Sequence, residues 1–181
     1  MTEIPLICHP QSDAGSIERI DVSLTRGAGG KIELTYRIFG ELDALKIASP
    51  KMPIRADGLW KTTCFELFIG SYEDETYLEY NFAPSGQWAA YQFSGYRADI
   101  ADLVTCVPDI KVEHKAGVCI FSVMLQLPNA WRQVTLRAGI SAVIATKSGD
   151  ISYWAAAHPP GKPDFHHKDC FAVHLEAPSA A

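Results

Sequence analysis

Strict alternation of apolar and polar residues is the feature of this chain that most constrains its fold. In RIDVSLTR (19–26) apolar residues recur at every second position from Ile20 onward, and KIELTYRIFG (31–40) repeats the pattern. The stretch GAGG (27–30) separates the two segments. Because successive side chains of a strand point to opposite faces, the pattern predicts an antiparallel hairpin with one face in water.

The same pattern extends along most of the chain. Turn sequences such as PSGQ (84–87), HKAG (114–117) and SGDI (148–151) recur at short intervals, and only PNAWRQ (128–133) resembles a helical turn. Many short strands with hairpin turns and no helical spacer predict an all-β fold, an antiparallel β-sandwich. The opening stretch and residues 40–60 are expected to be long loops. The further strand candidates are 62–70, 76–84, 87–95, 110–114, 118–127, 135–146, 150–156 and 170–176.

Length, charge and cysteine usage exclude several classes of protein. A chain of 181 residues suits a single domain, 1–181, whose closing APSAA is expected to be a short flexible C-terminal tail. The net charge of −5 and the lack of a basic run argue against nucleic acid and anionic membranes as partners. No signal-peptide pattern and no long apolar run is present, and the five cysteines are scattered, which predicts reduced thiols in the cytoplasm.

Two neighbouring strand candidates carry polar residues where a simple sheet would not. In CFELFIG (64–70) Glu66 shares a face with Cys64, and in YLEYNF (77–82) Glu79 shares a face with Asn81. Carboxylates among aromatic residues are typical of a small-molecule pocket, to which we expect nearby tryptophans to contribute. The alternative is a structural face, in which each Glu pairs with an arginine and each Trp packs in the core.

Three segments, 55–70, 77–97 and 153–167, resemble the bacterial DOMON-like proteins, relatives of the family 9 carbohydrate-binding modules. The resemblance covers about residues 15–176 and implies a jelly-roll or immunoglobulin-like β-sandwich, whose relatives bind sugars or haem on one face. Haem-binding members use axial Met and His, and the methionines here do not fit that role, so we expect no cofactor. For a sugar, the resemblance implies stacking by Trp60, Trp88 and Trp154, and hydrogen bonds from Arg55, Glu66, Glu79 and Asn81.

The segment HPPGKPDFHH (158–167) allows three interpretations. Its spacing matches no strong metal motif, and adjacent histidines of an extended chain point in opposite directions, so we expect no bound metal. A catalytic pair of Cys64 with a histidine of this segment is a second possibility. The composition favours a third, a rigid hydrogen-bonding rim beside the pocket, stiffened by prolines. A close alternative is a clasp, in which Asp164 or a histidine only ties down the loop.

The sequence therefore predicts non-covalent binding of a small polar ligand, a sugar or sugar-like metabolite, and leaves the oligomeric state open. One alternative is a hydrolase or isomerase that uses Glu66 and Glu79, or Cys64 with a histidine, in the same pocket. Another is an interaction scaffold without a small-molecule ligand. The predicted ligand-binding residues are Arg55, Trp60, Cys64, Glu66, Glu79, Asn81, Trp88, Trp154, His158, Asp164, Phe165 and His166.

Overall fold

The computed structural model describes residues 3–49 and 51–178, which form twelve β-strands and no α-helix. Short 3-10 turns cover Ala28–Gly30, Leu42–Ala44, Leu59–Lys61, Asn129–Trp131 and Lys168–Cys170. The strands are β1 (Glu3–Cys8), β2 (Ile17–Arg26), β3 (Lys31–Gly40), β4 (Cys64–Ser71), β5 (Tyr77–Phe82), β6 (Trp88–Phe93), β7 (Ala101–Asp102), β8 (Asp109–Lys115), β9 (Val118–Gln126), β10 (Leu136–Ala145), β11 (Ile151–Ala155) and β12 (Val173–Leu175).

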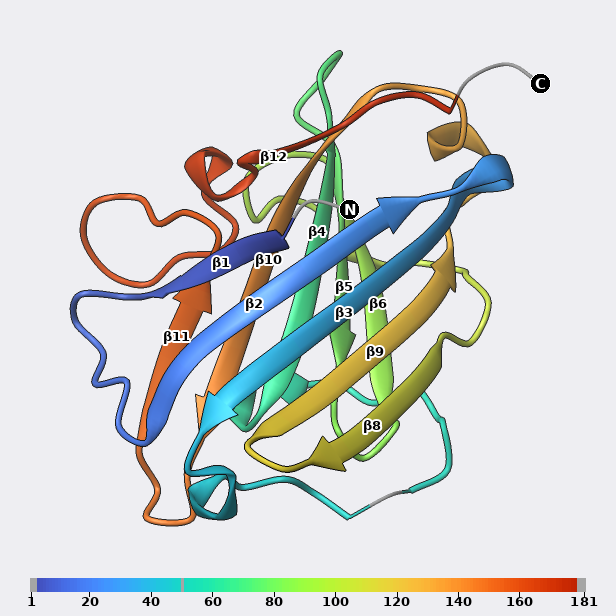
Figure 1. Ribbon diagram of the computed structural model, residues 1–181. Helices are drawn as coiled ribbons and strands as arrows, with labels where there is room; N and C mark the ends of the chain where they lie inside the picture. Colours follow the sequence, from blue (N-terminus) through green and yellow to red (C-terminus); the bar gives the residue numbers. More distant parts are fainter. Residues whose placement is uncertain (1–2, 50, 179–181) are drawn as a thin grey trace.

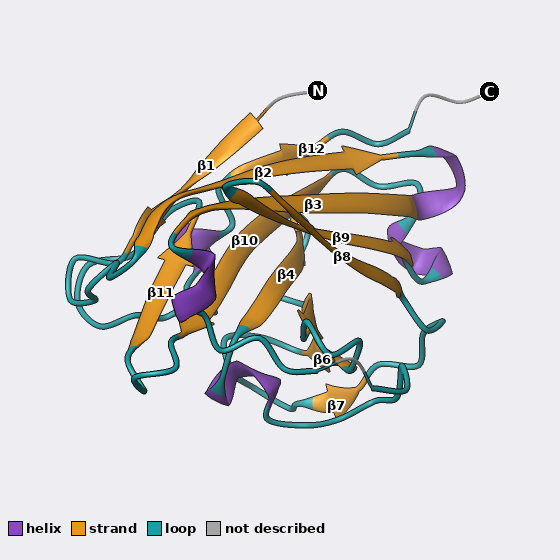
Figure 2. Ribbon diagram, turned by 60° about the horizontal axis from the view of Figure 1, so that its bottom comes forward, coloured by secondary structure: helices purple, strands orange, loops and turns teal. Residues whose placement is uncertain are grey.

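The strands form two packed layers that share β1. The first layer has the order β1-β2-β3-β9-β8, and the second has the order β7-β6-β5-β4-β10-β11, with β12 beside β10. All the ladders between these strands are antiparallel. Residues 3–6 of β1 pair with β2 and residues 7–8 with β11, so this strand turns the corner between the layers. Figure 1 shows the first layer in front of the second, and Figure 2 shows the two from another side. The predicted antiparallel β-sandwich is confirmed.

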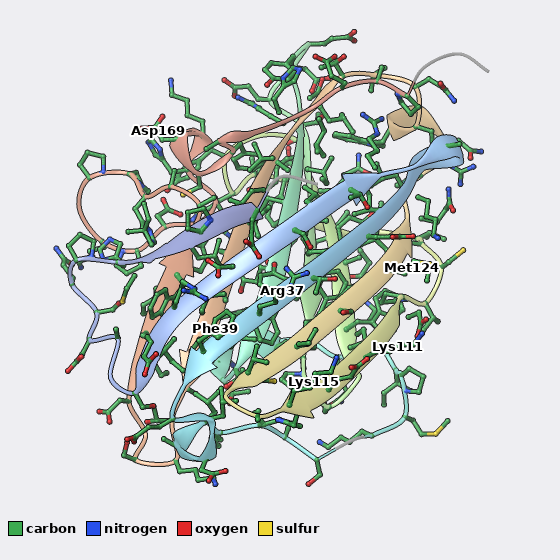
Figure 3. The ribbon with its side chains drawn as sticks, in the orientation of Figure 1. Arg37, Phe39, Lys111, Lys115, Met124 and Asp169 are labelled. Carbon is green, nitrogen blue, oxygen red and sulfur yellow. The ribbon has the colours of Figure 1, made fainter. Side chains whose placement is uncertain are left out.

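The hairpin predicted from the alternating pattern is β2–β3. Ile20 pairs with Ile38 and Leu24 with Leu34, and the apolar face lies in the core. The opposite face of the first layer carries Arg37, Lys111 and Met124, which Figure 3 shows in front of the sheet. Alternation of this kind commits a strand to one register, because a slip of one residue would turn every apolar side chain to water.

The main core lies between the layers. Phe65 on β4 stacks on Phe121 on β9 with ring centroids 4.2 Å apart, and the Tyr36 ring lies 4.8 Å from Phe65. The Tyr36 hydroxyl donates to the backbone oxygen of Glu66 at 2.8 Å, which satisfies a fully buried polar group. This contact joins the first layer to the strand that carries the buried glutamate.

Some expectations about loops were wrong. The opening stretch contains β1, which is paired on both sides and is therefore part of the sheet. The alternation signal is weak there because β1 is short and only Leu6 among its described residues is buried. In the segment expected as a second loop, residues 41–49 and 51–60 contain short 3-10 turns and no strand. The short strand β7 was not predicted. The expected flexible tail, 177–181, lies mostly outside the described residues.

A second apolar cluster covers the outer face of the second layer. Residues 156–171, called here the covering segment, bring Phe165, Cys170 and Phe171 against Phe68 and other outward side chains of this layer. Gly139 on β10 allows the approach, since a Cβ there would lie 3.1 Å from the Cys170 carbonyl oxygen. The outer face of the second layer is therefore a covered surface with room for a cleft.

Candidate functional site

A cleft of about 450 Å³ opens between the outer face of the second layer and the covering segment. We call it the outer-face cleft. Its volume lies within the range of small-molecule sites, roughly 300–1,000 Å³. It is lined by Trp60, Glu66, Glu79, Tyr91, Phe93, Arg97, Ile100, Val143, Tyr153, Pro163, Phe165 and His166.

Strand register places both glutamates at this cleft. Glu66 on β4 lies opposite Asn81 on β5 and opposite Ser141 on β10, while Glu79 lies opposite Phe68. All these residues therefore share one face, as the strand pattern predicted. The Ser141 hydroxyl donates to Glu66 Oε2 at 3.2 Å, and Asn81 Nδ2 donates to Glu79 Oε1 at 2.7 Å. Asn81 itself is fully buried and orients Glu79.

Burial changes the charge state of these acids. Glu66 is 3% exposed, and desolvation together with the nearby Glu79 raises its pKa from the usual 4.5 to about 8. Desolvation also raises the pKa of Glu79, which is 6% exposed, against the opposing effects of Asn81 and Arg97. Near neutral pH the floor of the cleft therefore holds at least one protonated carboxyl group, Glu66.

A histidine connects this floor to the covering segment. Nδ1 of His166 lies 2.8 Å from the Tyr77 hydroxyl, which accepts the backbone N–H of Arg97 at 3.1 Å. The hydroxyl proton is therefore available to Nδ1, which leaves the ring proton on Nε2, 3.8 Å from Glu79 Oε2. Desolvation and the Arg97 charge lower the pKa of His166 to about 4, so the ring is neutral at neutral pH.

Asp164 holds one edge of the cleft in place. Its carboxylate accepts hydrogen bonds from the Tyr96 hydroxyl at 2.6 Å, from the Arg97 guanidinium at 2.8 Å and from the backbone N–H of His166 at 3.2 Å. These donors hold the pKa of Asp164 below its usual range against the effect of burial. Arg97 adopts φ 52°, a conformation uncommon outside glycine, at the turn that carries it to Asp164.

Aromatic side chains form the walls. Glu79 lies opposite Tyr91 in the β5–β6 ladder. The Trp60 ring packs edge-on against the Tyr91 ring, with ring centroids 6.5 Å apart. Tyr153 and Phe165 meet at 6.1 Å across the other side. Trp60 is 44% exposed, so a large apolar surface is available at the mouth of the cleft.

Two predicted tryptophans lie elsewhere, and here the structure corrects the sequence interpretation. Trp88 pairs with Phe82 and Trp154 with Ala142, so both point into the core between the layers. Their indole N–H groups are satisfied there, by the Pro53 carbonyl at 3.4 Å and by the Ser152 hydroxyl at 2.9 Å. Pairing register, which composition does not reveal, turned them away from the cleft.

Arg55 and Cys64 do not line the outer-face cleft. Arg55 forms ion pairs with Asp57 and Asp102, and its guanidinium lies 5.2 Å from the Tyr91 ring centroid. Cys64 is fully buried, and its thiol contacts Asn81 Oδ1 at 3.8 Å. Burial and the neighbouring Glu66 raise the pKa of this thiol well above its usual value, which is the opposite of what an activated nucleophile requires.

Some residues of HPPGKPDFHH line the cleft, as the rim interpretation predicts, and others only hold the covering segment in place, as the clasp interpretation predicts. Pro163, Phe165 and His166 line the outer-face cleft, as a rim would. His158 instead donates from Nε2 to the Ile7 carbonyl oxygen at 2.8 Å and packs edge-on against His9. Together with Asp164 it fastens the segment, as a clasp would.

Sequence reasoning missed several lining residues, chiefly Tyr91, Phe93, Arg97 and Tyr153. Tyr91 and Phe93 could have been predicted. Counting outward from the PSGQ turn pairs Phe82 with Trp88, which places Tyr91 opposite Glu79. No local signal marks Arg97 and Tyr153, which arrive from a turn and from β11.

The described residues contain no group of three or more His, Cys, Asp or Glu side chains placed to hold a metal ion. Among the same residues no helix is long and apolar enough to cross a membrane. All five cysteines are free thiols.

Comparison with known proteins supports the fold. No family model matches the chain, and no curated protein matches it. A solved structure described as a "putative carbohydrate-binding protein", from Bacteroides uniformis, is 14% identical with a TM-score of 0.64, covering 94% of this chain and 84% of that one. A family 9 carbohydrate-binding module from Caldicellulosiruptor kristjanssonii, in complex with cellotriose, is 8% identical with a TM-score of 0.56, covering 88% of this chain and 74% of that one. At these identities the likeness establishes a carbohydrate-binding-module-like fold.

Proposed function

We propose that this protein binds a small polar ligand, a sugar or sugar-like molecule, non-covalently in the outer-face cleft. The observation that carries the proposal is a set of aromatic walls around two deeply buried carboxyl groups, Glu66 and Glu79. Aromatic faces pack on the C–H faces of a sugar ring, and a few fixed polar groups orient its hydroxyls. The two structurally similar proteins support this, because both are named for carbohydrate binding.

The test is calorimetric titration with a panel of neutral and charged monosaccharides and short oligosaccharides, including cellotriose. We expect Trp60→Ala to weaken binding by roughly tenfold or more, because it removes the exposed wall at the mouth. Tyr72→Ala is the matched control, since Tyr72 is an exposed aromatic residue that does not line the cleft. Equal loss in both variants, or no binding by any member of the panel, would contradict the proposal.

Acid–base catalysis in the same cleft is the second candidate. It is favoured by the raised pKa of Glu66 near a second carboxyl group, an arrangement found where a general acid is needed. The assay is hydrolysis of aryl glycosides and interconversion of free sugars between pH 5 and pH 8. Turnover that is lost in Glu66→Gln would support an enzyme, and tight binding without turnover would support a binding protein. The structure gives no support to a Cys64–His pair.

We also propose that the chain is a single domain that works in a reducing compartment, the cytoplasm. The shared strand β1 and the common core support one folding unit. The five free thiols fit a reducing compartment. Mass spectrometry of the protein, alkylated in denaturant before and after reduction, would show five alkylated cysteines in both samples.

A further inference from the structure

Each glutamate at the floor of the outer-face cleft has one oxygen that the protein leaves unused. Glu66 Oε2 is held by Ser141 and Glu79 Oε1 by Asn81. Within residues 3–49 and 51–178 no group donates a hydrogen bond to Glu66 Oε1 or Glu79 Oε2. Both side chains are more than nine-tenths buried, and both line the cleft. Because both side chains line the cleft and these two oxygens have no donor from the protein, the oxygens are available to a ligand there.

The charges around the floor compensate these acids only in part. Arg97 is the cation that lines the cleft, and its guanidinium is bound to Asp164, whose charge balances it. His166 is neutral near pH 7, and the neighbouring Cys64 and Tyr77 are also neutral there, with pKa values raised by burial. A cation brought by a ligand would therefore meet two acidic groups and no free positive charge.

The walls suit the same kind of ligand. Trp60, Tyr91, Phe93, Tyr153 and Phe165 surround the floor, and the faces of aromatic rings attract ammonium groups when water is displaced. A primary ammonium group has three N–H donors, enough for both unused oxygens. A single neutral hydroxyl has one donor and no charge, so a neutral sugar would need two hydroxyls to reach both oxygens and would still lack the charge attraction to the carboxylates.

We propose that the ligand of this cleft is an amino sugar, or a similar polyhydroxyl amine, whose ammonium group donates to Glu66 Oε1 and Glu79 Oε2. The inference rests on the proposed function and names the ligand class for that site. The sugar ring then lies between the aromatic walls. Because the raised pKa of Glu66 keeps this carboxyl group largely protonated near pH 7 before a ligand binds, binding of the cation releases a proton to the solvent.

The experiment is calorimetric titration at pH 7 with three matched pairs: glucose and glucosamine, galactose and galactosamine, mannose and mannosamine. In at least one pair we expect the amine to bind tighter by roughly tenfold or more, the usual advantage of a hydrogen bond to a charged group. Repetition in phosphate and in MOPS buffers, which differ in ionisation enthalpy, should show proton release with the amine and none with the neutral sugar.

Glu66→Gln should reduce the affinity for the amine to that for the neutral sugar, while exposed Glu113→Gln should leave the preference unchanged. A thermal melt checks that each variant is folded, and Glu79→Gln serves as the second test of the same contact. If at least one neutral sugar binds and in every pair the neutral sugar binds as tightly as its amine, the inference is overturned and the proposed function stands. A full amine preference in both glutamate variants also overturns it. If no member of any pair binds, the inference and the proposed function fail together.

Discussion

Replacing Glu66 with glutamine should change how the stability of this protein depends on pH. Glu66 is 3% exposed, and its pKa is raised from 4.5 to about 8. The folded state therefore binds the proton of this carboxyl group more tightly than the unfolded chain does. The stability that this proton gives is fully present below pH 4.5 and is lost as the pH rises through 8. Glutamine has the same shape and no charge, so the loss should vanish in the variant.

The magnitude follows from the shift. A difference of 3.5 pH units (8 − 4.5) corresponds to about 5 kcal/mol in total, at about 1.4 kcal/mol per unit. Much of this loss falls between pH 4.5 and pH 6.5. Between pH 6.5 and pH 9 the remaining loss is about 2 kcal/mol. Over that range the free energy of unfolding of Glu66→Gln should rise relative to the wild type by this amount.

The assay is urea denaturation of both proteins at intervals from pH 6.5 to pH 9, with fluorescence of the four tryptophans as the signal. The two proteins differ at this one side chain, and burial keeps the neighbouring Cys64 and Tyr36 neutral over this range, so the difference between the two curves reports on Glu66. Glu113→Gln, at an exposed position, should give a curve parallel to the wild type. Parallel curves for wild type and Glu66→Gln would refute the reasoning, because they would mean that Glu66 is hydrated in the folded protein.

Three further outcomes can be measured. Trp88→Ala should lower the free energy of unfolding by about 3–5 kcal/mol because its ring lies in the core. Trp60→Ala should lower it by less than about 1 kcal/mol and mainly weaken ligand binding. Denaturation and ligand titration of both variants separate these effects, and a large loss of stability in Trp60→Ala would contradict this placement. Phe165→Ala should lower the free energy of unfolding by about 2–4 kcal/mol. Asp164→Ala should lower Tm, because it removes the hydrogen bonds that hold the covering segment. Unchanged thermal melts would show that this segment is not held in place by these contacts. Elemental analysis of protein purified without chelator or affinity-tag metal should find well below one equivalent of zinc, iron or copper, and a stoichiometric metal lost in His166→Ala would contradict this.

The candidate site shows how much can be predicted from the alternation of side chains along a strand. Glu66, Glu79 and Asn81 were placed on one face because residues two apart on a strand share a face and the more apolar face of each of the two strands turns to the core. The same rule was available for Trp88, whose position follows from the length of the turn before β6. The aromatic composition and the family resemblance, which implied stacking of Trp88 on a sugar, suggested the opposite. For Arg97 no local rule existed, since it reaches the cleft from a turn through its contact with Asp164.

The sequence by itself determined most strands of the sandwich, though not β1 and β7, together with the hairpin β2–β3 and the shared face of the buried acids. These depend on alternation and turn residues, which act over a few neighbouring positions. Only the tertiary structure decided that β1 joins the two layers, that Trp154 belongs to the core, and that the covering segment closes over Glu66 and Glu79. Such contacts join residues far apart in the chain, and they are selected by the burial of whole surfaces. The raised pKa of Glu66 has the same origin, because desolvation depends on everything packed around a carboxyl group.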